Sequence, residues 1–125
     1  MNLLVDSHVA IWWLEDPARL SPAARAAIAD GRNRVWLSVA SVWEIGLKAA
    51  RNKLRLPAGY VDILLADGFG ILEIRLAHAQ RAPALPSHHA DPFDRMLVAQ
   101  AEVEHLVLVT RDEALRAYGV PILSA

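Results

Sequence analysis

The sequence predicts a single α/β domain of three layers, with a central, mostly parallel sheet between helices. Short apolar runs without polar alternation recur along the chain, which is typical of strands covered on both faces. Longer segments with helix start and stop signals lie between these runs, so that strands alternate with helices. The chain has 125 residues, of which 54% are hydrophobic, and this is enough for one core. We therefore treat residues 1–125 as one domain.

Five elements are expected in the N-terminal half. Leu3-Leu4-Val5 is the first apolar run, and either Asp6 or Ser7 can cap the helix that follows it. Pro17 ends that helix, and Ser21-Pro22 begins the next, with serine as the cap and proline in the first turn. The expected elements are strand 3–5, helix 8–15, helix 21–29, strand 35–38 and helix 40–52.

The C-terminal half repeats the alternation. Ala82-Pro83 is expected to stop a short helix, Pro92 to open a long one, and Gly119 to end the last helical turn. Residues 83–91 are expected to form a loop. The expected elements are helix 60–66, strand 71–74, helix 77–81, helix 92–104, strand 107–109, helical turn 113–118 and strand 120–123.

Composition and charge exclude several classes of protein. The apolar runs are too short to span a membrane, and the N-terminus lacks the basic segment of a signal peptide. There is no cysteine, which excludes disulfides and thiolate metal sites. We therefore expect a cytoplasmic protein. The 13 basic and 14 acidic residues give a net charge of −1 without the basic excess of general nucleic-acid binders, although Arg51, Lys53 and Arg55 form a local basic cluster.

Four acidic residues adjoin apolar segments: Asp6, Glu44, Asp94 and Asp112. Asp6 and Asp112 come just after predicted strands. Because ligands bind beyond the carboxyl ends of parallel strands, both are expected at one edge of the sheet. At ~100° per residue, Asp94 falls on the same helix face as Leu97 and Val98, so it points with the core and not with the solvent.

Each acid also has a structural interpretation, which for Asp94 is an acid in the first turn of its helix, in a capping box with Asp91 and favoured by the helix dipole. Asp6 and Asp112 can cap the helices that follow them, and Asp91 is better placed as the cap of its helix than as a ligand. Glu44 precedes Lys48 by four residues, which favours a surface ion pair. For Asp112 the pattern favours neither interpretation over the other.

Histidine and tryptophan give weaker signals. His88 and His89 are interpreted as loop residues, because the further His or Cys ligands of a zinc site are missing. The four tryptophans lie in apolar segments, at positions 12, 13, 36 and 43. They are expected in the core or at an interface, and base stacking is the less favoured alternative.

Convergence of the four acids would require compensation. Two carboxylates ~5 Å apart repel by roughly 3 kcal/mol at an effective dielectric constant of about 20. Four such groups in one site exceed what a domain stable by ~5–15 kcal/mol can hold, so either some are protonated or a cation lies among them. Oxygen ligands favour Mg²⁺ or Mn²⁺, which can activate a water for phosphodiester hydrolysis. Ser7 and Thr110 are candidates to orient metal-bound waters, and Arg95 and Arg111 to contact phosphate.

Four motifs occur in order along the chain: Asp6-Ser7-His8 followed by Ile11-Trp12-Trp13-Leu14, Ser41-Val42-Trp43-Glu44-Ile45 with Lys48, Asp91-Pro92-Phe93-Asp94-Arg95 leading to Ala99-Gln100-Ala101, and Thr110-Arg111-Asp112. Together they resemble the PIN-domain family, and specifically the VapC-type ribonuclease toxins of toxin–antitoxin pairs. One departure is Asp-Ser in the first motif, where Asp-Thr is commoner in the family; serine keeps the hydroxyl.

The resemblance implies a PIN-like three-layer α/β/α fold, a Mg²⁺- or Mn²⁺-dependent endoribonuclease activity, a homodimer, and a VapB-type antitoxin whose tail blocks the site. By motif position it implies metal-site roles for Asp6, Glu44, Asp94 and Asp112, with Asp6 and Asp94 as direct ligands. Two alternatives stay open: a catalytically silent PIN-like interaction module, and a metal-dependent phosphatase or phosphoacceptor domain of similar build.

Overall fold

The computed structural model describes residues 1–125 and is built on one five-stranded sheet in the order β3-β2-β1-β4-β5. Every neighbouring pair of strands is parallel. The predicted α/β fold with a mostly parallel sheet is therefore confirmed, and the sheet is parallel throughout. The strands are β1 (Asn2–Val5), β2 (Arg34–Ser38), β3 (Gly70–Leu72), β4 (Val107–Thr110) and β5 (Ile122–Ser124).

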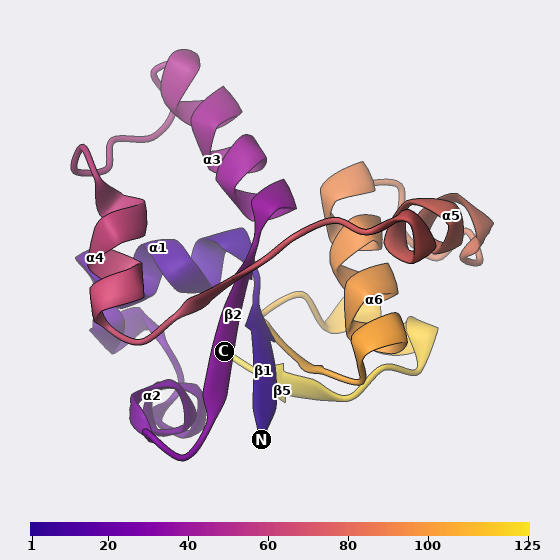
Figure 1. The fold of residues 1–125 in the computed structure, drawn as a ribbon, viewed down its shortest axis with the longest axis horizontal. Coiled ribbons are helices and arrows are strands. Elements are labelled where there is room, and N and C mark those ends of the chain that lie inside the picture. Colours follow the sequence, from indigo (N-terminus) through magenta and orange to yellow (C-terminus); the bar gives the residue numbers. More distant parts are fainter.

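Helices cover both faces of this sheet. In Figure 1, α1, α2 and α4 lie on one side of the strands and α5 and α6 on the other. The longest helix, α6, has 13 residues, and no helix has the length and apolar character needed to cross a membrane. The helices are α1 (Ser7–Glu15), α2 (Pro22–Ala29), α3 (Val39–Ala50), α4 (Tyr60–Ala66), α5 (Leu76–Ala84) and α6 (Pro92–Glu104), with short 3₁₀ helices η1 (Pro17–Arg19) and η2 (Glu113–Tyr118).

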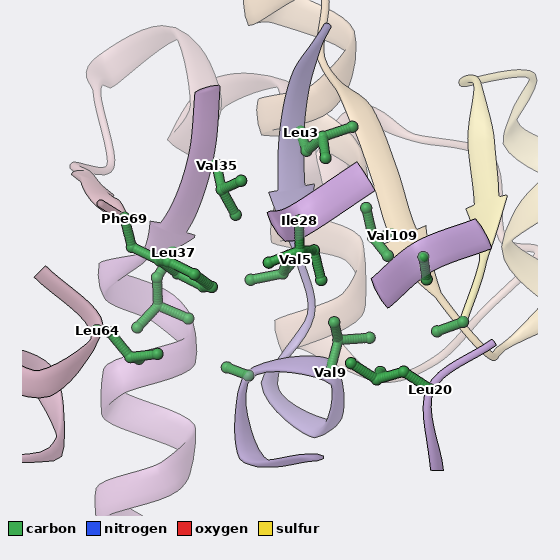
Figure 2. Close-up of a cluster of buried hydrophobic side chains, with 13 residues drawn as sticks. Leu3, Val5, Val9, Leu20, Ile28, Val35, Leu37, Leu64, Phe69 and Val109 are labelled. Carbon is green, nitrogen blue, oxygen red and sulfur yellow. The ribbon is translucent and has the colours of Figure 1, made fainter. Parts of the chain in front are cut away.

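Two buried clusters fill the space between the sheet and its helices. Leu3 and Val5 of β1 point into the first, where they meet Val9 of α1 and Ile28 of α2 (Figure 2). Leu4 points the opposite way, into a second cluster formed mainly with α6. Both faces of β1 are buried from Leu3 to Val5, and this stretch is continuously apolar, as the pattern predicted.

The ends of four elements differ from the predictions by two residues or more. Strand β3 stops at Leu72, two residues early, because it pairs with β2 and β2 ends at Ser38. Strand β5 begins at Ile122, since Pro121 has no N–H to give to a ladder. Helix α5 runs past Ala82 to Ala84; a proline in the last turn costs one hydrogen bond and does not end the helix there. Helix α3 ends at Ala50 and not at residue 52.

The strand order places a topological switch beside β1. From β1 the chain builds outward through β2 and β3 on one side, and then returns to build β4 and β5 on the other. The carboxyl ends of β1 and β4 are therefore neighbours, with Val5 opposite Val109. Open parallel sheets bind ligands at such a point. Asp6 and Asp112 follow these two strands.

Candidate active site

A cleft of about 480 Å³ opens at the carboxyl edge of the sheet. Carboxylates outnumber permanent cations around it by five to two. They are Asp6, Glu44, Asp91, Asp94 and Asp112, facing Lys48 and Arg111. The structure thus brings together the four acids singled out in the sequence, and adds Asp91 to them.

Asp6 serves both as a helix cap and as a wall of the cleft. Its Oδ1 accepts a hydrogen bond from the backbone N–H of Val9 at 2.9 Å, which caps α1. Its Oδ2 accepts the hydroxyl hydrogen of Thr110 at 2.5 Å, from the end of the neighbouring strand β4. The side chain is fixed at both oxygens and the residue is only 8% exposed. Asp6 therefore caps α1, as its structural interpretation expects, and also lines the cleft.

Asp112 has a similar double position on the other side of the switch. Its Oδ1 accepts from the backbone N–H of Ala114 at 3.0 Å and caps η2. Its own backbone N–H donates to the hydroxyl oxygen of Thr110 at 3.1 Å. The Thr110 hydroxyl is therefore hydrogen-bonded to both residues that follow the strand ends, Asp6 and Asp112.

Glu44 enters the cleft from α3. One carboxylate oxygen accepts the hydroxyl hydrogen of Ser7 at 2.5 Å, and the other lies 3.7 Å from Nζ of Lys48. The ion pair favoured by the sequence pattern is present, but it is not a surface pair, because the Glu44 side chain is only 14% exposed. Ser7 and Thr110 both direct their hydroxyl hydrogens at carboxylates, so in this structure they orient acids.

Asp91 and Asp94 come from the first turn of α6. Asp91 is the cap of the helix, with Oδ1 accepting from the backbone N–H of Phe93 at 2.8 Å. Asp94 lies three residues after Asp91, on the helix face that also carries Leu97 and Val98, and it lines the cleft. Burial, together with the neighbouring charge of Asp91, raises the pKa of Asp94 to about 7. Burial also raises the pKa of Asp6, against the hydrogen bond from Thr110, which lowers it.

These raised pKa values test whether the cleft suits a cation. Asp6 and Asp94 resist ionisation because they are buried beside other acids, and a divalent cation would remove that penalty. The acids around it offer oxygen atoms only, which is the donor set that Mg²⁺ and Mn²⁺ prefer. The residues present therefore fit such an ion.

The two arginines expected near phosphate behave differently. Arg111 lines the cleft, where its guanidinium lies 4.2 Å from the centre of the Trp12 ring and donates to the backbone oxygen of Ala125. Arg95 points away from the cleft, and its guanidinium donates to four backbone carbonyls of the preceding segment. The expected phosphate contact of Arg95 finds no support in this arrangement, because the protein's own chain accepts from both of its terminal nitrogens.

His89 lies in the loop before α6, as the sequence predicts, but it also contacts two of the cleft acids, which the sequence analysis did not predict. Its Nε2 lies 2.9 Å from Oδ2 of Asp112 and 3.5 Å from Oδ2 of Asp94. The contact joins residues 23 positions apart, so no local periodicity could show it. The available signal was its position two residues before the Asp91-Pro92 helix start. His88 is exposed, as expected for a loop residue, with its ring against Tyr118.

One tryptophan departs from the core. Trp12, Trp13 and Trp36 are partly buried and pack against the two core clusters. Trp43 is 64% exposed, and its ring meets Phe93 edge to face at 5.2 Å between centroids. Trp43 and Phe93 are the chain neighbours of Glu44 and Asp94, so this aromatic pair lies next to the acidic residues.

Comparison with known proteins identifies the family. A model of the PIN domain matches residues 3–121. The chain is 35% identical over 123 residues to ribonuclease VapC22 of Mycobacterium tuberculosis, which covers 96% of this chain and 94% of that protein.

Solved structures share the fold. VapBC2 from Rickettsia felis, crystallised with a DNA fragment from its promoter, gives a TM-score of 0.76 at 13% identity, over 99% of this chain and 98% of that one. FitAcB from Neisseria gonorrhoeae gives 0.62 at 22% identity, over 97% and 96%. These findings confirm the resemblance drawn from the four motifs. The chain belongs to the PIN-domain family and is a homologue of a VapC ribonuclease.

Proposed function

We propose that residues 1–125 form one PIN domain that acts as a Mg²⁺- or Mn²⁺-dependent endoribonuclease, the toxin of a VapBC-type toxin–antitoxin pair. The observation that carries the proposal is the convergence of four carboxylates on one cleft, in a homologue of ribonuclease VapC22. The four residues are Asp6, Glu44, Asp94 and Asp112. Their distribution over two helices and two strand ends makes an accidental acidic patch a poor explanation.

Asp6 and Asp94 are the proposed direct ligands of the cation, with Glu44 and Asp112 completing the site. A divalent cation held there would supply a Lewis acid for hydrolysis of a phosphodiester bond. Ser7 and Thr110 hold the carboxylates of Glu44 and Asp6 in fixed orientations through their hydroxyl groups. Such outer hydrogen bonds set the geometry of metal ligands in other sites.

A basic groove beside the cleft supports a polyanionic substrate. The groove has a volume of about 450 Å³ and shares Glu44, Lys48 and Asp91 with the cleft. It adds Arg51 and Lys53, two members of the basic cluster in the sequence. A chain with a net charge of −1 can thus place cations locally where RNA phosphates would approach the acids.

A cytoplasmic location, a VapB-type antitoxin and a homodimer complete the proposal. The structural relatives include a toxin–antitoxin complex from Klebsiella pneumoniae and VapBC2 from Rickettsia felis. Sedimentation of the purified chain alone tests the homodimer. Sedimentation together with the product of a neighbouring small gene tests the antitoxin complex. A monomer that forms no complex would contradict this part of the proposal.

The activity is tested with purified protein and total RNA, in millimolar Mg²⁺ or Mn²⁺ and in EDTA. We expect cleavage with metal only, and none for Asp94→Asn. Glu102→Gln is the matched control, because Glu102 lies on the same helix but pairs with Arg81 at the surface. Cleavage in EDTA, or full activity of Asp94→Asn, would contradict the proposal. Metal binding without cleavage of any RNA would favour a silent module.

A further inference from the structure

His89 is tied to two of the cleft acids by one nitrogen atom. Its Nε2 lies 2.9 Å from Asp112 and 3.5 Å from Asp94, measured to Oδ2 of each. One atom of each of these three side chains lies within 4.8 Å of the other two. The distances alone allow two roles for the imidazole. It can bind a metal ion through Nε2 beside the carboxylates, or it can donate a hydrogen bond to them.

The other ring nitrogen decides between these roles. Nδ1 of His89 accepts a hydrogen bond from the backbone N–H of Asp91 at 3.1 Å. A nitrogen that accepts carries no hydrogen, so the hydrogen of the neutral ring is on Nε2. A histidine that binds metal through Nε2 has the opposite arrangement, since its Nδ1–H donates to an acceptor. The backbone of Asp91 therefore sets the ring as a donor toward the carboxylates.

We propose that His89 is a positioning residue, which holds the Asp112 carboxylate for the cation by donating its Nε2–H, and is not a metal ligand. The proposal rests on the metal-dependent nuclease function proposed above. Without His89, the carboxylate of Asp112 is held only by its cap bond to Ala114 on the short helix η2. With it, both carboxylate oxygens are bonded and the plane of the group is fixed.

The backbone that carries His89 is itself anchored. Nη1 of Arg95 donates to the carbonyl of His89 at 3.3 Å and to that of Pro86 at 2.9 Å. Nη2 donates to the carbonyls of Ala82 at 2.9 Å and Leu85 at 3.0 Å. One guanidinium thus spans the segment from α5 to His89. The Asp91-Pro92-Phe93-Asp94-Arg95 motif therefore contains both a cleft acid and the residue that holds the histidine loop.

The tautomer is the first test, and it needs no enzyme activity. We would record long-range ¹H–¹⁵N spectra of the imidazoles in metal-free protein and then after adding Mg²⁺, with His89→Gln for assignment. The expected result is a neutral ring with hydrogen on Nε2 in both states. Hydrogen on Nδ1, or the ¹⁵N shift of a metal-bound Nε2 after Mg²⁺ is added, would overturn the proposal and make His89 a ligand.

Metal affinity is the second test. By calorimetry with Mn²⁺, His89→Ala should bind about 10–100-fold more weakly than wild type, the usual effect of losing an outer hydrogen bond to a ligand. His89→Gln, whose amide can donate, should recover most of the affinity. His88→Ala is the matched control and should bind as wild type, because its exposed ring contacts Tyr118 and not the acids. A melting curve for each variant separates weak binding from unfolding.

The outcomes separate the two proposals. Equal Mn²⁺ affinity of wild type and His89→Ala, with RNA cleavage intact in both, would overturn the role of His89 and leave the nuclease function standing. Absence of Mn²⁺ binding in wild type and His88→Ala alike would overturn the nuclease function, and the positioning role with it.

Discussion

Asp94 and Arg95 are adjacent on α6, yet their surroundings are opposite. Asp94 faces a cleft in which carboxylates outnumber cations, and burial there raises its pKa to about 7. Arg95 faces the loop before the helix, where four carbonyls and the hydroxyl of Tyr118 accept its hydrogen bonds. The charge of Arg95 is compensated by the chain itself, whereas that of Asp94 is not.

The difference separates structural charge from functional charge. A charged group whose partners all come from its own chain stabilises the fold and has little left to offer a ligand. Carboxylates gathered without enough cations cost stability, and the protein recovers this cost only when a cation binds. Sites that bind ions are expected to have this second character. We can therefore test the difference between the two residues by removing the Arg95 side chain, by neutralising Asp94, and by titrating Asp94 with a cation or with pH.

Replacement of Arg95 should give the largest effect on stability. Arg95→Ala removes five hydrogen bonds and leaves partly buried carbonyls without their donor, so we expect a loss of roughly 2–4 kcal/mol in the free energy of unfolding. Urea unfolding followed by circular dichroism would measure it. Arg81→Ala removes an exposed ion pair and should cost less than about 1 kcal/mol. Equal losses in the two variants would show that the Arg95 cluster is not a structural anchor.

Binding of a cation should stabilise the protein, because it compensates the negative charge of the cleft acids. At a Mg²⁺ concentration about 100 times its dissociation constant, wild type should gain about 2.7 kcal/mol in the free energy of unfolding. Asp94→Asn should gain far less, because it removes a proposed ligand. Arg81→Lys should keep the gain, since Arg81 pairs with Glu102 at the surface and does not line the cleft. Thermal unfolding over a Mg²⁺ titration checks this, and a gain in Asp94→Asn equal to that of wild type would place the ion elsewhere.

The two sides also differ in how far the sequence could predict them. Asp94 could be predicted, because an acid on an apolar helix stripe stands out, and the order of strands and helices places Asp6 and Asp112 at one edge of the sheet. The structural role of Arg95 could not. Its partners are backbone carbonyls, which every residue carries, so no residue pattern marks them.

The same limit applies to His89 and to the edge strand. The contact of His89 with Asp112 depends on how an irregular loop folds, and apolar periodicity gives no information about that. The length of β3 depends on where its partner β2 ends, which is a property of the pair and not of residues 70–74. Local patterns thus predicted elements and strand-end acids, and failed where the contact was made by backbone or loop atoms.

The pH dependence of metal-free protein should report Asp94. Because its folded-state pKa is raised from 3.8 to about 7, the folded state binds this proton more tightly than the unfolded state. The resulting stability is fully present below pH 3.8 and is lost as the pH rises to about 7 and above. Allowing for solvent screening, we expect Asp94 to account for roughly 1–2 kcal/mol of this fall.

Unfolding of wild type and Asp94→Asn in EDTA from pH 4 to pH 8 isolates that contribution. The difference in unfolding free energy between the two proteins should change in favour of Asp94→Asn as the pH rises. A difference that stays constant with pH would mean that Asp94 ionises freely, and the contrast with Arg95 would then lose its electrostatic basis.

Thr110→Val sharpens the comparison with the smallest expected change. Valine keeps the shape of the buried side chain but removes the hydroxyl that donates to Asp6 and accepts from the backbone N–H of Asp112. The pKa of Asp6 should rise further, and metal-free protein at pH 8 should lose about 1 kcal/mol. Thr110→Ser keeps the hydroxyl and should lose less stability. A serine hydroxyl already holds one carboxylate of this cleft, because Ser7 of the first motif donates to Glu44. If valine instead left stability and Mg²⁺ affinity unchanged, the hydroxyl would not hold Asp6, and the orientation of that carboxylate would have to come from its cap bond to Val9 alone.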